Sequence, residues 1–242
     1  MKVGLTLPQF RHEAGPALDT ARRAEAAGLD GVFVFDHLWP LGRPDRPALH
    51  GHTLAAALLA TTSRLCVGTL VARVGLLPDA VLANQFTTLA RMAGGRLVAG
   101  LGVGDALSRP ENLAVGVPFR PREERLASLV DVSRRLRARG ITTWVGGHST
   151  TVRAIGRAEA DAVNVWGVPP DALAGMAAEE REAGALTWAG QVDLSTSGVA
   201  EVADLLRTVS AAGATWAVVA PVNGPWPEAV ETVAAAGRSL VD

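Results

Sequence analysis

Residues 67–105 read VGTLVARVGLLPDAVLANQFTTLARMAGGRLVAGLGVGD and hold a complete strand–helix–strand unit. Apolar runs at 64–72 and 96–104 predict two strands. Between them, 78–93 predicts a helix, because a proline stands in its first turn and two glycines follow its end. Both strands are nearly continuous Val, Leu and Ala, which is typical of parallel strands that are covered on both faces.

The same alternation of strand and helix extends over the whole chain. Further strands are predicted at 3–9, 31–37, 142–148, 162–166, 185–192 and 215–221. Further helices are predicted at 14–27, 54–62, 122–139, 150–158, 171–183, 199–212 and 227–240. A strand and its helix take about 30 residues on average, the size of a βα unit. Eight such pairs favour a closed (β/α)8 TIM barrel with reduced insertions over an open doubly wound sheet.

The composition agrees with one folded domain. Of the 242 residues, 48% are apolar and 19% are charged, which excludes a disordered chain, a coiled coil and a collagen-like fibre. Barrels of this class commonly form a single domain of 200–250 residues. Because no linker or compositional shift interrupts the pattern, we expect one domain over 1–242.

Charge and cysteine content limit the partners and the compartment. With 23 basic and 24 acidic residues, the chain has no basic surplus to attract nucleic acid. No apolar run approaches the roughly 18 residues of a membrane helix, so we expect no membrane partner. A single cysteine, Cys66, and strand-like sequence directly after Met1, without a signal peptide, favour a cytoplasmic location.

Several kinds of chemistry are excluded by residue type. The chain has one lysine, Lys2, so a P-loop and a mid-fold Schiff base are both excluded. His50 and His52 flank a glycine and resemble a pair of metal ligands. The pair precedes a helix and no carboxylate cluster accompanies it, so we expect no metal site.

The active site of a TIM barrel lies at the carboxyl ends of its strands. Asp36 and His37 end the second predicted strand, where an acid–imidazole pair can orient a ligand and exchange a proton near neutral pH. The alternative is a carboxylate that caps the loop beside a merely exposed histidine. The residues alone leave both interpretations open.

Two glycine-rich segments end other strands. The run GLGVGD at 100–105 permits close approach of a ligand to the backbone, although a tight turn is the simpler interpretation. It departs from the dinucleotide fingerprint at Asp105. Gly146 and Gly147 precede hydroxyl residues at a helix start and predict an anion cradle, to which Arg153 adds charge. An ordinary helix cap is the alternative there.

Four segments taken together resemble the bacterial luciferase-like flavin and deazaflavin oxidoreductases, most of all the branch that uses coenzyme F420. They are 28–40 (GLDGVFVFDHLWP), 67–105, 111–119 (ENLAVGVPF) and 144–166 (WVGGHSTTVRAIGRAEADAVNVW). The resemblance implies a TIM barrel that binds F420 or FMN at the carboxyl ends of its strands. It also implies a non-proline cis peptide after the third strand.

The resemblance further implies roles for individual residues. His37 would be the catalytic proton donor or acceptor, and Asp105 would stand where some F420 enzymes have a catalytic glutamate. The expected cofactor contacts are Asp36, Leu70, Val71, Gly102, Val103, Gly104, Ser108, Gly146, Gly147, His148 and Ser149. The expected substrate contacts are Gln9 and Trp39. Many family members have Trp-Asn after the glycine run, whereas this chain has Asp105-Ala106.

Three functions follow as hypotheses. The first is an F420-dependent oxidoreductase that transfers hydride between the deazaflavin and a small organic substrate. The second is an FMN-dependent monooxygenase of the same fold, which the anion cradle suits equally well. The third is a flavin-binding protein without turnover, suggested by the short chain and the missing Trp-Asn. The family resemblance also implies a homodimer.

Overall fold

The computed structural model describes residues 1–180 and 185–240, in which strands and helices alternate. The strands are β1 (Lys2–Thr6), β2 (Gly31–Val34), β3 (Cys66–Thr69), β4 (Ala72–Arg73), β5 (Leu97–Gly102), β6 (Thr142–Gly146), β7 (Ala162–Trp166), β8 (Ala185–Asp193) and β9 (Ala214–Val222). The α-helices are α1 (Gly15–Ala27), α2 (Gly51–Thr61), α3 (Asp79–Ala93), α4 (Arg109–Ala114), α5 (Arg122–Arg137), α6 (Thr150–Glu159), α7 (Pro170–Glu180), α8 (Val199–Ala211) and α9 (Trp226–Arg238). A short 3-10 helix, η1 (Ala106–Ser108), precedes α4.

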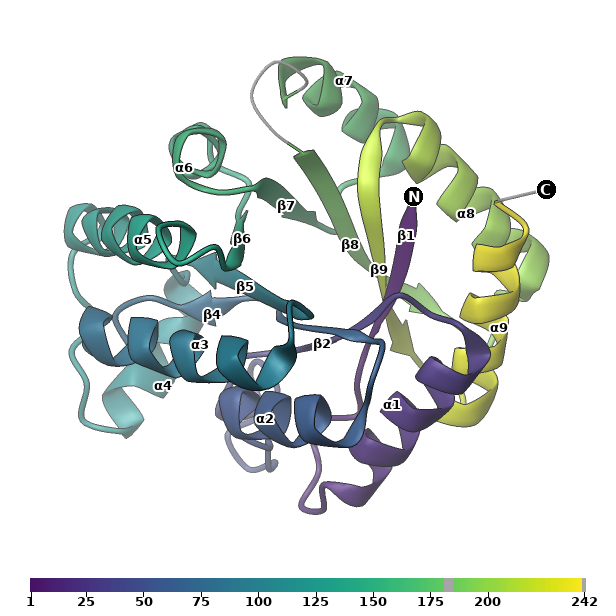
Figure 1. Ribbon diagram of the computed structural model, residues 1–242, viewed down its shortest axis with the longest axis horizontal. Helices are drawn as coiled ribbons and strands as arrows, with labels where there is room; N and C mark the ends of the chain where they lie inside the picture. The colour runs from purple at the N-terminus through teal and green to yellow at the C-terminus, as the bar shows by residue number, and fades with distance from the viewer. Residues whose placement is uncertain (181–184, 241–242) are drawn as a thin grey trace.

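The strands form one parallel sheet that closes on itself. Their order is β3-β2-β1-β9-β8-β7-β6-β5-β4, and an additional pairing of β3 with β5 completes the ring. In that pairing Val67 lies opposite Leu97 and Gly68 opposite Val98. Figure 1 shows the strands at the centre and the helices around them. The prediction of a (β/α)8 TIM barrel is therefore confirmed.

The third position of the barrel is interrupted. The sequence predicts one strand at 64–72, but the structure has two short strands, β3 and β4, which both pair with β5. The peptide bond between Leu70 and Val71, which separates them, is cis, as the family resemblance implies. β3 and β4 together thus fill one of the eight positions in the barrel.

Aromatic side chains fill the barrel interior. The rings of Phe33 and Trp144 stack with centroids 5.3 Å apart, and Trp216 meets both rings edge-on. Gly68 makes room for this cluster, because a Cβ atom there would lie 2.5 Å from the Phe33 ring. A packed interior is normal for this fold and leaves the carboxyl ends of the strands as the place for a ligand.

The helices match their predicted positions closely, with one omission. The segment between β5 and α5 was predicted without a helix, yet it contains η1 and α4. Helix α2 begins at Gly51, earlier than predicted, because His50 caps it by accepting a hydrogen bond from Thr53 N. Residues 181–183 of the predicted helix 171–183 lie outside the described residues. No described helix has the length and apolar character that crossing a membrane requires.

Candidate active site

The carboxyl ends of β1, β7, β8 and β9 and the segment after β2 line an open cavity of about 470 Å³, here called the mouth cavity. Phe35 provides an aromatic wall, since its ring stacks on Phe10 and meets Trp166 edge-on at 5.7 Å. Arg11 and Arg46 also line it, and its described lining contains no carboxylate. The mouth cavity therefore combines apolar surface with positive charge, which suits a small ligand carrying negative charge.

Gln9 lines the mouth cavity, but its amide is already engaged. Its Nε2 donates to the carbonyl oxygens of Phe35 and Leu49 at 2.8 and 2.7 Å, and its Oε1 accepts from Phe35 N at 2.7 Å. The side chain is fully buried. Gln9 thus holds the ends of β1 and β2 together, and contact with substrate remains a prediction for it.

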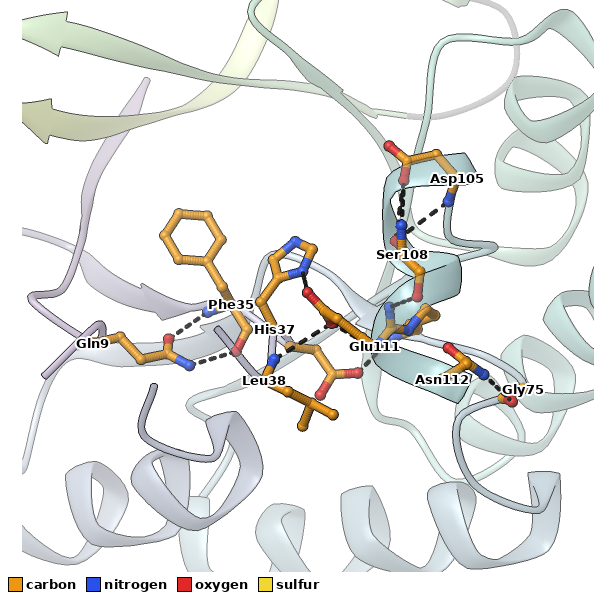
Figure 2. Close-up of polar contacts among 11 residues, drawn as sticks. Gln9, Phe35, His37, Leu38, Gly75, Asp105, Ser108, Glu111 and Asn112 are labelled. Atoms are coloured by element: carbon orange, nitrogen blue, oxygen red, sulfur yellow. Dashed lines mark hydrogen bonds and ion pairs between the residues drawn. The ribbon is translucent and has the colours of Figure 1, made fainter. Parts of the chain in front are cut away.

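His37 follows β2 and is fixed by a buried ion pair that the sequence reading did not anticipate. Its Nδ1 lies 2.9 Å from Oε1 of Glu111, which comes from α4. The second oxygen of Glu111 accepts from Arg73 Nη2, also at 2.9 Å. Figure 2 shows the rings of Phe35 and His37 pointing to the same side, with Glu111 reaching His37 from α4. The contact leaves Nε2 of His37 as the ring atom that can exchange a proton.

Glu111 is held in its charged form. Burial would raise its pKa, but the hydrogen bond with His37 and the charges of His37 and Arg73 outweigh burial and lower the pKa below its ordinary value. Arg73 is itself buried and also donates to the carbonyl oxygen of Ser108. A buried, ionised carboxylate thus fixes the His37 ring.

Asp36 is directed away from its neighbour His37. Its Oδ2 accepts from the backbone N–H of Arg73 at 2.8 Å, and the side chain is buried. It lines a second cavity of about 280 Å³, here called the lateral cavity, together with His50 and His52. Asp36 thus ties the loop that follows β2 to strand β4. Its contact with a cofactor remains a prediction.

Asp105 and Ser108 engage each other. Oδ1 of Asp105 accepts from the N–H and the hydroxyl of Ser108 at 3.0 and 3.1 Å, which caps η1. Asp105 is exposed and Ser108 is buried. Catalysis by Asp105 and cofactor contact by Ser108 remain predictions, and the contacts seen here stabilise the turn after β5.

The end of the glycine run is held by Arg125 from α5. Its Nη1 donates to the carbonyl oxygens of Val103 and Gly104, and its guanidinium lies 4.0 Å from the centre of the Phe119 ring. Gly104 has φ +68°, and a Cβ atom there would lie 2.7 Å from Arg73. Glycine is therefore required at this turn.

Val71, directly after Leu70, packs against glycines of two neighbouring strands. A Cβ atom on Gly102 or Gly146 would lie 2.5 or 2.8 Å from a Val71 methyl group. These glycines thus leave the space that the Val71 side chain takes, and an apolar platform results at the ends of β5 and β6. An apolar platform of this kind suits one face of a planar ring.

The start of α6, where the sequence predicts an anion cradle, is capped by a serine and approached by an arginine. Ser149 caps the helix by accepting from Val152 N, and Arg122 donates to the same hydroxyl at 3.1 Å. The N–H of Gly147 donates to Asn164 O, and cofactor contact by Gly147 remains a prediction. His148 is exposed beside the cap. The helix start with its adjacent guanidinium suits a phosphate group.

The residues present therefore fit a flavin or deazaflavin. The planar ring needs an apolar platform, which Val71 would supply. The charged tail needs an anion site, which Ser149 and Arg122 would supply. Proton exchange beside the ring needs a group such as His37. Trp39 lies half-buried in the loop after His37, and its contact with substrate remains a prediction.

Sequence reading missed Arg73 and Glu111. Glu111 opens the segment 111–119 that resembles the family, which was the one available signal for it. Arg73 follows an apolar run directly and nothing local marks it. Both charges are buried and paired with each other, which only the fold reveals.

Several curated proteins with similar sequences are named as F420-dependent glucose-6-phosphate dehydrogenases. An F420-dependent glucose-6-phosphate dehydrogenase of Kineococcus radiotolerans is 35% identical over 138 residues, which cover 57% of this chain and 40% of that protein. Its counterpart in Intrasporangium calvum is 32% identical over 155 residues, 62% of this chain and 46% of that protein. The chain thus spans less than half the length of either relative.

Solved structures share the fold at low sequence identity. An F420-dependent secondary alcohol dehydrogenase in complex with an F420-acetone adduct has a TM-score of 0.81 at 13% identity, covering 96% of this chain and 97% of that one. A riboflavin lyase with modified FMN has a TM-score of 0.77 at 14% identity, covering 100% and 91%. The model of the luciferase-like monooxygenase family matches residues 1–186. The chain therefore belongs to the luciferase-like monooxygenase family.

Proposed function

We propose that this chain is an F420-dependent oxidoreductase that transfers hydride between the deazaflavin and a small organic substrate. One observation carries the proposal: His37, at the barrel mouth, is fixed by the buried Glu111–Arg73 pair. The curated relatives, both named as F420-dependent dehydrogenases, support F420 as the cofactor.

The predicted binding residues form two groups, one for each part of the cofactor. Val71 and the glycines beside it would support the ring, and Ser149 with Arg122 would hold the phosphate-bearing tail. Arg11 and Arg46 give the mouth cavity positive charge. We infer that the substrate carries a negative group, because no described carboxylate of the lining offsets these two charges.

When bound, F420 supplies the hydride chemistry. Nε2 of His37 takes the proton that an alcohol substrate releases as it is oxidised, and returns the proton in the reverse direction. Glu111 is a positioning residue, because it acts through Nδ1 of His37 and stabilises the protonated ring. The charge of Arg73 keeps Glu111 ionised, so that Glu111 can stabilise the protonated ring of His37.

An FMN-dependent monooxygenase is the second candidate. The riboflavin lyase of similar fold has modified FMN in its structure, and the predicted anion site at α6 suits the FMN phosphate equally well. FMN that remains bound during purification, with turnover that requires oxygen, would favour this candidate. A homodimer, as the resemblance implies, remains a prediction for either cofactor.

Reconstitution with each cofactor separates the two. The purified protein is incubated with F420 or FMN and a panel of phosphorylated sugars and hydroxy acids, and the oxidation state of the cofactor is followed by its visible absorption. We expect reduction of F420 by at least one substrate, strongly slowed in His37→Ala and unchanged in the exposed control His12→Ala. Binding of F420 without hydride exchange over the whole panel would contradict the proposal and indicate a binding protein without turnover.

A further inference from the structure

Asp36, His50 and His52 meet at the lateral cavity. One ligand atom from each of the three side chains lies within 4.8 Å of the other two. Two of the residues come from the start of α2, and the third follows β2. We propose that these side chains bind a divalent transition-metal ion of the zinc class. The proposal does not rest on the proposed oxidoreductase function, although Asp36 is also one of the predicted cofactor contacts.

His52 supplies the strongest reason for a ligand. Its side chain is only 7% exposed, yet neither ring nitrogen has a hydrogen-bond partner among the described residues. Its ring meets Phe86 edge-on at 5.1 Å, which fixes its orientation. A buried polar group without a partner costs free energy, about 1–3 kcal/mol in proteins. A cation bound to one of these nitrogens would remove the cost.

His50 has one ring nitrogen on the helix cap and one directed elsewhere. In this structure its Nδ1 caps α2 by accepting from Thr53 N, and it also lies 3.1 Å from Thr53 Oγ1. To bind an ion through Nε2, the ring would change tautomer, so that Nδ1 carries the proton and donates to Thr53 Oγ1 in place of the cap, as metal-binding histidines commonly do. The ring of His50 lies 5.7 Å from that of His52, measured between centroids.

Asp36 adds a carboxylate to the two histidines as a third ligand. Its carboxylate is buried, and with Oδ2 bonded to Arg73 N its Oδ1 remains for an ion. The positive charge nearest to the carboxylate, on Arg73, is paired with Glu111 at 2.9 Å. The absence of a carboxylate near His50 and His52 in the sequence led us to expect no metal there. The fold brings Asp36 to them.

The donor set indicates the kind of ion. Two imidazoles and one carboxylate suit zinc and other first-row divalent ions, with a further position open to water. Zinc–nitrogen bonds of about 2.0–2.1 Å place two tetrahedral ligand atoms about 3.3 Å apart, so the ligand atoms must approach one another by up to about 1.5 Å. His50 is exposed and has the freedom to move. The rest of the lateral cavity is lined by Arg73 and by apolar side chains, among them Leu76, Leu77 and Leu82.

The proposal is tested by titrating untagged, metal-free protein with Zn²⁺ in a calorimeter. We expect one ion per chain, and a loss of affinity of about 10-fold or more in His50→Ala, His52→Ala and Asp36→Asn. His12→Ala is the matched control, because His12 is exposed and outside the cluster, and it should bind as the wild type does. Zn²⁺ should also raise the melting temperature of the wild type but not of Asp36→Asn.

Three results would overturn the proposal. The first is wild-type protein that takes up no Zn²⁺ at micromolar concentrations. The second is undiminished affinity in Asp36→Asn, which would indicate adventitious binding to His50 and His52 alone. The third is a loss of Zn²⁺ affinity in the His12→Ala control that is as large as the loss in the ligand variants. Because His50 is exposed, His50→Ala should fold even if substitution of the buried His52 prevents folding.

Discussion

Nδ1 of His37 and Oε1 of Glu111 lie 2.9 Å apart although 74 residues separate them in the sequence. The contact joins the loop after β2 to α4. Because Glu111 is also bonded to Arg73, the histidine is held by a chain of charges that reaches into β4. The orientation of the candidate catalytic ring therefore depends on the segment between β5 and α5.

Removing the charge of Glu111 should destabilise the fold. Glu111→Gln leaves Arg73 buried without its counter-charge, which typically costs about 3 kcal/mol. Urea unfolding near neutral pH measures the change. Asp131→Asn is the control, because its ion pair with Arg135 is exposed and should contribute no more than about 0.5 kcal/mol. Equal stability of the two variants would show that the buried pair contributes little.

The stabilisation due to Glu111 should depend on pH. Its pKa is lowered by folding, so its contribution is fully present above its ordinary value of 4.5 and is lost as the pH falls through the lowered value. Between pH 7 and about pH 4, the wild type should lose more of its unfolding free energy than Glu111→Gln does. If the unfolding free energy of both proteins fell equally over this pH range, the pH dependence could not be assigned to Glu111.

His37 and Asp105 should differ in their effect on turnover. His37→Gln removes the proton-exchanging ring and should lower kcat by about 10²-fold or more. Asp105→Asn retains an acceptor for the N–H of Ser108 but removes the carboxylate predicted to be catalytic, so it should lower kcat less than His37→Gln does. Steady-state kinetics with the reconstituted enzyme compares them. A larger loss of kcat in Asp105→Asn than in His37→Gln would indicate that Asp105, and not His37, is the main proton-exchanging residue.

The packing of the barrel interior predicts a contrast between two glycines. A Cβ atom on Gly68 would lie 2.5 Å from the Phe33 ring, so Gly68→Ala should cost about 1–3 kcal/mol of stability. Gly15, at the start of α1, has nothing within 4 Å of the corresponding position. Gly15→Ala should be neutral or slightly stabilising. Thermal unfolding of both variants checks the contrast, and the same melting temperature in both would contradict it.

Ser149 should contribute to stability and to binding of the cofactor tail. Ser149→Ala removes the side-chain acceptor for Val152 N and should cost about 1 kcal/mol. It also removes the hydroxyl that orients Arg122, so F420 should bind more weakly. Ser149→Asp restores the cap but places a negative charge at the anion site. It should therefore recover stability and bind F420 more weakly still, and recovered affinity would contradict an anion site there.

The architecture was predictable because each βα unit carries its own signals. The run 67–105 shows strand, helix and strand from hydrophobic patterning, and the glycines after α3 mark its end. The break between β3 and β4 was less accessible from the residues, since 65–72 (LCVGTLVA) reads as one strand with no proline or charge at the break. The cis bond at Leu70–Val71 was anticipated through the family resemblance rather than through local pattern.

The site was predictable only in part, for a physical reason. A strand end marks where a side chain such as His37 emerges, and this can be read locally. Its partners cannot, because Glu111 and Arg73 pair with each other across 38 residues. Likewise, Asp36 and His52 are buried and lie close together only because of the path of the loop between β2 and α2. Contacts over such separations are specified by the fold and carry no short-range signal.

Cofactor binding tests the central proposal most directly. F420 is titrated into the purified protein and its fluorescence is followed, with FMN titrated in parallel. We expect saturable binding of one F420 per chain in the micromolar range or tighter, and weaker binding in Gly146→Val, whose side chain would meet Val71. No saturable change with F420, or unaltered affinity in Gly146→Val, would contradict a deazaflavin site at the barrel mouth.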